Sequence, residues 1–259
     1  MYFLIQSNIK GDTDHEGIIQ VLEELNIGYE TIELTNLIEK IEVKAERNDV
    51  FVFGSVKLAR LAKSNTNWYP GSFYGGNHLF EINSKYYKDN LLNYETEIFK
   101  FGDNIEWKDN EYKFIKPYKE AKIFTGKVFT KIKWQDFVEE SLLNPKTPLL
   151  TKDSTVQASI PQEIIKEARL WIVGKQVVAG VYYRFHKDVT FESEVASDGI
   201  EFAKKMIDTF NVAEAFVMDI CLTYNGWKIV EINCVNSAGF YPNLNVKSLV
   251  RALDVYFTE

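Results

Sequence analysis

Residues 215–241, AFVMDICLTYNGWKIVEINCVNSAGFY, predict a β-hairpin that decides how the rest of the chain is interpreted. Two runs rich in strand-forming residues flank a turn signal at Tyr224-Asn225-Gly226. The length of the turn fixes which residues face each other, and a slip of one residue exchanges the two faces of the hairpin.

The apolar pattern selects one register of this hairpin. A two-residue Asn225-Gly226 turn would set the charged Asp219 opposite the apolar Ile232. A three-residue loop with Gly226 in the left-handed conformation shifts the register by one. The second register gives three matched pairs: Met218 with Ile232, Ile220 with Val230, and Asp219 with Glu231. We therefore expect the second register.

In that register Asp219 and Glu231 have Cβ atoms roughly 5 Å apart, and Asn233 follows Glu231 on the same face. Carboxylate and amide oxygens favour Mg²⁺, which takes the rest of its shell from water and substrate phosphates. The alternative is an exposed polar face without a ligand. Three less polar residues are predicted to share the face, which favours the metal site: Cys221, Ile229 and Trp227.

Composition narrows the class of protein. The chain has 259 residues, 46% of them hydrophobic, and a formal charge of -7, which argues against nucleic acid or an anionic membrane as the main partner. Two cysteines and three histidines are too few for a disulfide framework or a His-based metal site. Tyr2–Ile5 is too short for a signal peptide and no stretch could span a membrane, so a cytoplasmic location is expected.

The N-terminal part alternates strands and helices. Strands expected at Tyr2–Gln6, Tyr29–Leu34 and Asp49–Phe53 indicate a small parallel sheet. Gly54 and Ser55 stand where a strand ends and a helix begins, which is either an anion or ligand position or a tight turn. The aromatic, glycine-rich loop Trp68–Asn77 is interpreted as a domain boundary.

The middle of the chain carries basic residues in strands and loops. Lys116 ends a strand, with Lys122 and Thr125-Gly126 in or just after the next loop, an arrangement suited to a polyphosphate. Arg169 and Arg184 lie in two strands joined by a turn. Arginines inside a sheet need anionic partners, either a neighbouring glutamate or a bound phosphate.

The order of these elements resembles the ATP-grasp superfamily of carboxylate–amine ligases, in a branch found in phage and bacterial genomes. Four segments carry the resemblance, which covers roughly residues 50–245: IKPYKEAKIFTG at 115–126, VQASI at 156–160, EARLWIVGK at 167–175, and the D…ExN hairpin running into NSAGF at 236–240.

The resemblance implies a mixed α+β and α/β architecture: an ATP-grasp fold with two α+β subdomains that grip ATP, preceded by a small parallel-sheet domain. The expected parts are residues 1–88 for the parallel domain, 89–160 for the subdomain with the phosphate-covering loop, and 161–259 for the subdomain with the metal site.

The resemblance also implies roles for individual residues, with ATP and Mg²⁺ as cofactors. Mg²⁺ ligands would be Asp219, Glu231 and Asn233; nucleotide contacts would be Lys116, Lys122, the backbone of Val156, Gln157 and Ser159, and Glu163 at the ribose. Catalytic contacts to the transferred phosphate would come from Arg169, Arg184 and Lys122, and substrate contacts from Asn236, Gly54 and Ser55.

The implied reaction joins a carboxylate to an amine. The carboxylate attacks the γ-phosphate of ATP, and the amine then displaces phosphate from the acyl-phosphate, leaving ADP and phosphate. Cations neutralise the charge that builds up, and the closing loop excludes water. The expected partners are small-molecule or peptide carboxylates and amines. Two alternatives stay open: a kinase that uses the same platform with an alcohol acceptor, and a nucleotide-binding module without turnover.

Overall fold

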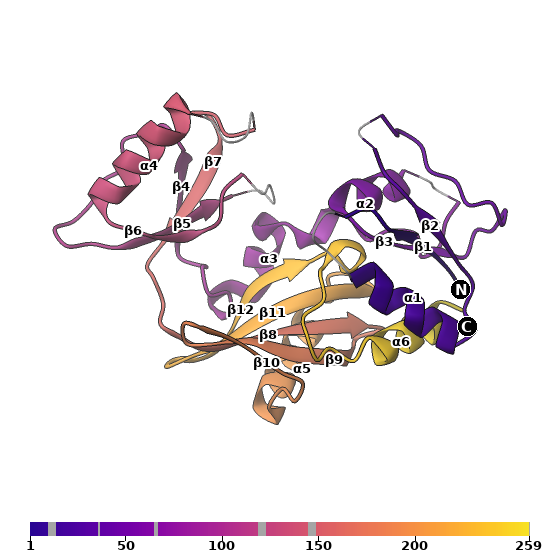
Figure 1. Cartoon of the computed structure of the whole chain (residues 1–259). Helices are drawn as coiled ribbons and strands as arrows, with labels where there is room; N and C mark the ends of the chain where they lie inside the picture. The colour runs from indigo at the N-terminus through magenta and orange to yellow at the C-terminus, as the bar shows by residue number, and fades with distance from the viewer. Residues whose placement is uncertain (10–13, 36, 65–66, 119–122, 145–148, 259) are drawn as a thin grey trace. The chain divides into compact units, whose positions relative to one another are not determined.

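A computed structural model describes residues 1–9, 14–35, 37–64, 67–118, 123–144 and 149–258. The chain forms two compact units, one made of Met1–His78 with Ile164–Glu259, the other of Leu79–Glu163. Figure 1 shows the elements of both units in order along the chain. The finer three-part division expected from the sequence stays a prediction about folding units.

A three-stranded parallel sheet opens the first unit, in the order β2-β1-β3. Its strands are β1 (Tyr2–Gln6), β2 (Tyr29–Ile32) and β3 (Val50–Phe53). All four residues of β3 are buried, as expected for a parallel strand covered on both faces. The accompanying helices are α1 (Asp14–Glu24) and α2 (Val56–Lys63), and the short helix η1 spans Gly76–His78.

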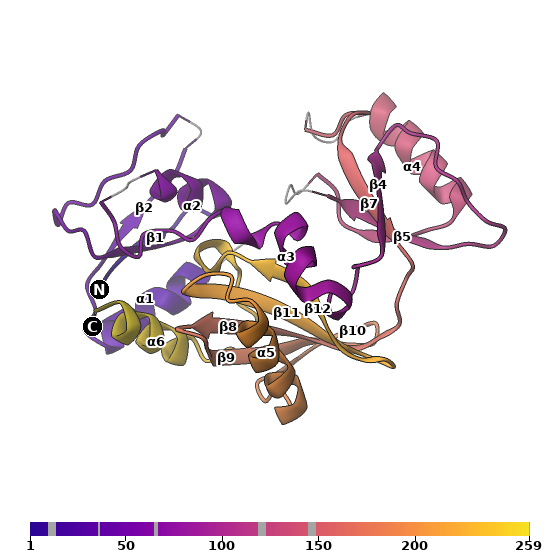
Figure 2. The same cartoon turned by 180° about the vertical axis from the view of Figure 1, so that it is seen from behind.

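The second sheet of this unit is antiparallel, in the order β10-β9-β8-β11-β12. Its strands are β8 (Ile164–Val173), β9 (Gln176–Phe185), β10 (Asp188–Glu192), β11 (Ala215–Thr223) and β12 (Gly226–Asn233). The remaining elements are α5 (Ser197–Thr209), η3 (Val235–Ser237) and α6 (Val246–Thr258). Figures 1 and 2 show α1 and α6 on one face of this sheet and α5 on the other.

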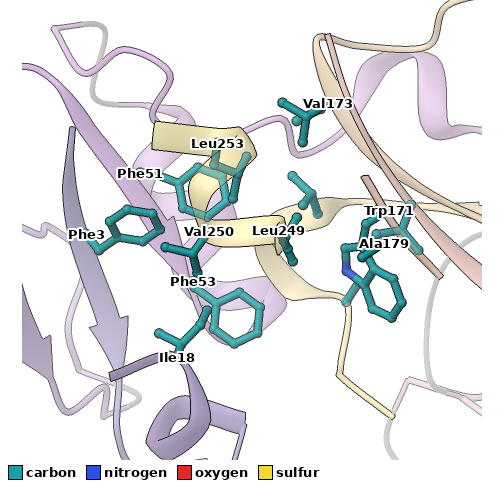
Figure 3. Close-up of a cluster of buried hydrophobic side chains, with 14 of the residues drawn as sticks. Phe3, Ile18, Phe51, Phe53, Trp171, Val173, Ala179, Leu249, Val250 and Leu253 are labelled. Atoms are coloured by element: carbon teal, nitrogen blue, oxygen red, sulfur yellow. The ribbon is translucent and has the colours of Figure 1, made fainter. Parts of the chain in front are cut away.

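One apolar core joins the two sheets of the first unit. Phe3 and Phe51 of the parallel sheet meet edge to face at 5.5 Å. Leu249 and Leu253 of α6 and Trp171 of β8 belong to the same buried cluster (Figure 3). The first and last parts of the chain are thus held together by a shared interior.

The second unit is built on a four-stranded antiparallel sheet, in the order β4-β7-β5-β6. Its elements are α3 (Phe80–Tyr87), η2 (Lys88–Asn90), β4 (Thr96–Lys100), β5 (Lys113–Pro117), β6 (Lys127–Phe129), α4 (Lys131–Leu143) and β7 (Thr155–Ser159). The Thr130 hydroxyl caps α4 by accepting a hydrogen bond from the Lys133 N–H at 3.4 Å. Trp134 of α4 packs into an aromatic core beneath one face of the sheet.

The register of the β11–β12 hairpin corrects one sequence prediction and agrees with another. Asp219 pairs with Glu231, as predicted, but Ile220 pairs with Ile229 and not with Val230. The turn between Thr223 and Gly226 contains two residues, and a β-bulge after Asp219 supplies the extra residue. Gly226 does adopt a positive φ of 94°.

The expected fold class is confirmed: mixed helices and sheets, with one parallel sheet and two antiparallel ones. The edge strands β4 and β10 were not predicted, because neither shows a clean alternation of buried and exposed residues. Among the described residues, the helices are too short or too polar to cross a bilayer. Cys221 and Cys234 are both free and buried.

Truncating Leu253 to Ala tests whether the shared core holds the first unit together. Leu253 is 1% exposed, so the variant leaves a cavity and should lose about 2–5 kcal/mol of unfolding free energy. Val255→Ala is the control in the same helix, since Val255 is 56% exposed and should change stability by less than about 0.5 kcal/mol. Chemical denaturation measures both; equal small effects would contradict this account of the core.

Candidate active site

The predicted metal ligands lie together on β11 and β12. The Asn233 amide nitrogen donates to Asp219 Oδ2 at 3.3 Å and to Glu231 Oε1 at 3.0 Å. Asp219 is 2% exposed, whereas Glu231 is exposed to solvent. The three side chains therefore converge on one point, with one carboxylate inside the protein and one at its surface.

Arg169 of β8 binds the buried carboxylate. Its Nε donates to Asp219 Oδ1 and its Nη2 to Asp219 Oδ2, both at 2.8 Å, which makes a bidentate pair. Its Nη1 donates to the Gly239 carbonyl at 3.0 Å. The ring of Tyr241 lies 4.9 Å from the guanidinium carbon, so a cation–π contact covers the remaining face. Arg169 is thus held between strand and loop.

The electrostatics of Asp219 follow from these neighbours. Burial raises the pKa of Asp219, the Arg169 guanidinium opposes that rise, and the Glu231 carboxylate adds to it, with a result of about 6. Burial works to lower the pKa of Arg169, but Asp219 outweighs it and the pKa lies above its usual range. A pair of carboxylates with one guanidinium leaves an excess of negative charge, which suits a cation.

A second acidic group lies two residues before Arg169. Glu167 is buried and accepts hydrogen bonds from the Tyr183 hydroxyl at 2.6 Å and from Arg184 Nη1 at 2.7 Å. Burial, followed by the charges of Asp219 and Glu167, raises the pKa of Tyr183. Of the two partners left open for Arg184, the structure contains the glutamate. The Arg184 side chain is 46% exposed, so part of it remains available to a ligand.

The β-bulge removes two residues from the face on which the sequence placed them. Ile229 pairs with Ile220, and Trp227 donates from Nε1 to Asp198 of α5 at 2.9 Å. Both therefore lie on the face that α5 covers. Cys221 stays on the Asp219 face, beside Glu167, where burial raises the pKa of its thiol to about 12.

The predicted substrate contacts have internal roles. Asn236 is fully buried; its amide donates to the carbonyls of Val52 at 2.7 Å and Gly71 at 3.2 Å, and its oxygen accepts from the Phe73 N–H at 2.8 Å. This corrects the prediction for Asn236, because its polar atoms tie β3 to the loop at Phe73 and face no solvent.

Gly54 and Ser55 also serve the fold. A Cβ on Gly54 would lie 2.5 Å from the Gln6 Cβ, so only glycine fits there. Ser55 is the N-cap of α2 and accepts from the Leu58 N–H at 3.3 Å. The tight-turn alternative describes both residues, and a substrate contact at either stays a prediction.

In the second unit, Lys116 is half-buried at the end of β5. A Cβ on Gly126 would lie 2.8 Å from the Lys116 Cβ and 2.8 Å from Phe114 Cζ. The backbone at Gly126 therefore lies directly against Lys116, and only glycine allows this approach. Lys122 lies outside the described residues.

The residues predicted to face adenine lie on β7. This strand is interior: Gln157 pairs with Ile98 on one side and with Lys116 on the other. Its backbone N–H and C=O groups serve the two ladders, so the predicted backbone contacts to a base are not available there. Ser159 donates to Asn93 Oδ1 at 2.9 Å, and Glu163 is exposed after the strand.

Two site residues were missed by the sequence analysis. Tyr241 stacks on Tyr183 with ring centroids 4.7 Å apart and also contacts Arg169. Tyr241 is the last residue of the stretch that organises the sequence, and its aromatic ring two residues after Gly239 was the available signal. Tyr183 precedes Arg184 in β9, but a bulge after Glu167 decides that its hydroxyl reaches the carboxylate.

The donor set fits Mg²⁺. Each ionised carboxylate offers about four lone-pair sites, so Asp219 can hold a metal while Arg169 occupies two of them. Turning the Asn233 amide would present its oxygen in place of its nitrogen. Over the described residues, no cluster of three His, Cys, Asp or Glu side chains could hold a metal. Such a site needs oxygens from a substrate, as Mg²⁺ commonly does.

Comparisons with known proteins agree with this geometry. A family model of the ATP-grasp domain, describing family 3 of one of its clades, matches residues 67–253. No curated protein sequence matches the chain significantly.

Solved structures with the same fold share little sequence with the chain. The Bacillus anthracis D-alanine–D-alanine ligase complexed with ATP has 11% identity over 99% of this chain and 96% of that one, with a TM-score of 0.70. The ATP-grasp ligase PsnB complexed with a minimal precursor has 13% identity over 98% of each chain and a TM-score of 0.63. The macrocyclase MdnC from Microcystis aeruginosa, bound with the precursor peptide MdnA, has 11% identity over 100% of each chain and a TM-score of 0.57.

Glu231→Gln should separate the repulsion of the two carboxylates from their role in the fold. At about pH 4 Asp219 is mostly protonated in the folded chain and carries no charge to repel Glu231, so variant and wild type should be close in stability. As pH rises through about 6, Asp219 ionises beside Glu231 and the wild type loses stability that the variant keeps. At pH 7 the variant should be more stable by about 0.5–1.5 kcal/mol.

Denaturation across pH 4–8 measures this difference. Glu201→Gln, at an exposed carboxylate on α5, is the control and should show no such trend. A Glu231→Gln variant that is less stable than the wild type at pH 7 would mean that Glu231 supports the metal-free fold.

Proposed function

This chain belongs to the ATP-grasp domain family, and on that basis we propose that it is an ATP- and Mg²⁺-dependent ligase. The proposed reaction joins a carboxylate to an amine through an acyl-phosphate and releases ADP and phosphate. The observation that carries the proposal is the meeting of Asp219, Glu231 and Asn233 with Arg169 inside the segment that the family matches.

The proposed ligands of the metal are Asp219, Glu231 and Asn233. When bound, Mg²⁺ neutralises charge on the ATP phosphates and orients them for transfer. Asp219 is fixed for this task by the bidentate Arg169 pair, so it loses little side-chain freedom when the metal enters. Glu231 is exposed and can adjust its position.

Cationic side chains of this chain supply the remaining charge. Arg169 is held against Asp219, Gly239 and Tyr241, so its charge is preorganised and costs no reorganisation during phosphoryl transfer. Arg184 is anchored at one end by Glu167 and is proposed to present its free donors to the transferred phosphate. Lys116 is proposed to contact the nucleotide phosphates and Lys122 to act in the covering loop, with Glu163 at the ribose.

The proposed substrates are a carboxylate and an amine, either small or part of a peptide. Two of the structural relatives are described with precursor peptides and one as a D-alanine–D-alanine ligase, so the fold accommodates both sizes. The overall charge of -7 makes a nucleic acid an unsuitable acceptor. A cytoplasmic location, where ATP is available, goes with this proposal.

Nucleotide and metal should stabilise the protein together rather than singly. At MgATP concentrations about 100 times Kd, stabilisation should reach about 2.7 kcal/mol and raise the melting temperature. Mg²⁺ alone should give little shift, because Arg169 already neutralises Asp219 and phosphate oxygens are missing from the metal shell. Thermal unfolding with Mg²⁺, with ATP plus EDTA, and with MgATP tests this; no shift with millimolar MgATP would contradict ATP binding.

Turnover distinguishes the proposal from the kinase and from the binding module. ADP release is measured against pools of amino acids, small carboxylates and peptides, followed by mass spectrometry of the product. A ligase gives ADP and inorganic phosphate in equal amounts only when an amine is present, with a product joined by loss of water. A phosphorylated alcohol would identify a kinase, and binding without any ADP release would identify a module without turnover.

Gly126→Ala tests the placement of Lys116. The added methyl group would collide with the Lys116 Cβ at 2.8 Å, so the lysine must shift and MgATP affinity should fall roughly 10-fold, or about 1.4 kcal/mol. Gly17→Ala is the matched control: no atom lies within 4 Å of its Cβ, and a helical alanine should stabilise α1 by about 0.5–1 kcal/mol. Unchanged affinity in Gly126→Ala, measured by calorimetry, would argue against the phosphate role of Lys116.

A further inference from the structure

The side chain of Gln157 is an unpaired polar group in the interior of the second unit. The residue is 2% exposed, and neither its Nε2 nor its Oε1 has a hydrogen-bond partner. A buried amide without partners is costly, since it has given up water and gained nothing in return. The neighbouring Ser159 shows the usual outcome, because its buried hydroxyl bonds to Asn93 at 2.9 Å.

The position of Gln157 on the sheet is defined by its neighbours in β7. Val156 and Ala158 belong to the aromatic core of this unit. Side chains alternate along a strand, so Gln157 points to the opposite face. Its cross-strand partner on β5 is Lys116, and directly paired residues share a face. The unpaired amide therefore lies next to the lysine assigned to the nucleotide phosphates.

The chemistry of a carboxamide restricts what could satisfy it. Phosphate oxygens only accept hydrogen bonds, so a phosphate would leave Oε1 without a donor. A partner for both ends must present a donor and an acceptor side by side. The adenine base does so, with its N6 amino group next to N1 on one edge and N7 on the other, and Gln pairs with adenine in this bidentate way.

We propose that the Gln157 carboxamide reads the adenine base of the nucleotide. This goes beyond the proposed function, on which it rests, because it assigns nucleotide selectivity to one side chain. It also replaces the expected backbone contacts, which the two ladders of β7 exclude. Lys116 then holds the phosphates and Gln157 the base from adjacent strands of one sheet.

The test compares binding of three magnesium complexes by calorimetry: ATP, purine riboside triphosphate, which lacks the N6 amino group, and inorganic tripolyphosphate, which has no base. Wild type should bind ATP about 10-fold more tightly than purine riboside triphosphate. Gln157→Leu should lose that preference and bind ATP about 10- to 100-fold more weakly, while its tripolyphosphate affinity stays unchanged.

Two further variants guard the interpretation. Gln157→Glu keeps the shape of the side chain but removes its donor, so it should also lose the preference for ATP over purine riboside triphosphate. Gln135→Leu, the same substitution at an exposed site on α4, should bind every ligand like wild type. Without nucleotide, the melting temperature of Gln157→Leu should equal or exceed that of wild type, because the atoms removed have no partners there.

Three results would overturn the assignment. The first is a preference for ATP that survives in both Gln157 variants. The second is an equal loss of ATP and tripolyphosphate affinity, which would mean a disturbed phosphate site. The third is a lower melting temperature of Gln157→Leu with unchanged ATP selectivity, which would mean that internal water satisfies the amide. Failure of the wild type to bind MgATP at all would instead reject the proposed function, and the assignment with it.

Discussion

The bidentate pair between Arg169 and Asp219 is the interaction on which the rest of the site depends. It joins two neighbouring strands, β8 and β11, at the point where the shared apolar core gives way to polar side chains. Each partner is costly to bury alone, because a charge without a counter-charge loses its hydration. Pairing them permits a carboxylate to stay ionised inside the protein at neutral pH. That carboxylate is the fixed ligand of the proposed metal site.

The apolar core explains why this pair is rigid. On the face of the sheet that carries Asp219, Trp171 and Val217 continue the same rows into the cluster that contains Leu249 of α6 and Phe51 of β3. A close-packed interior leaves these strands little freedom to move. The N-terminal sheet, although it carries none of the proposed metal or phosphate ligands, therefore helps to hold Arg169 and Asp219 in place.

Charge is distributed around the pair in an ordered way. Tyr241 covers the guanidinium, stacks on Tyr183, and Tyr183 donates to Glu167, which also holds Arg184. Both arginines are thus tethered through carboxylates at one end while aromatic rings limit their movement. A ligand phosphate that enters meets cations that are already oriented, which is the arrangement expected of a phosphoryl-transfer site.

The sequence alone determined which strands exist around the hairpin, the class of fold, and the pairing of Asp219 with Glu231. These follow from local patterns: a period of two in strands, turn residues, and the mismatch of placing a charge opposite an apolar side chain. The sequence also named both arginines and stated that each needs an anion.

Only the tertiary structure decided which anion each arginine takes, and how the hairpin reaches its register. A bulge after Asp219 places Ile229 on the face that α5 covers, and its formation depends on packing against α5 and not on the turn. Burial decided the fate of Asn236 and Gln157: both are amides, and one bonds to three backbone groups while the other bonds to none. Such differences depend on neighbours distant in sequence, so no local pattern could have predicted them.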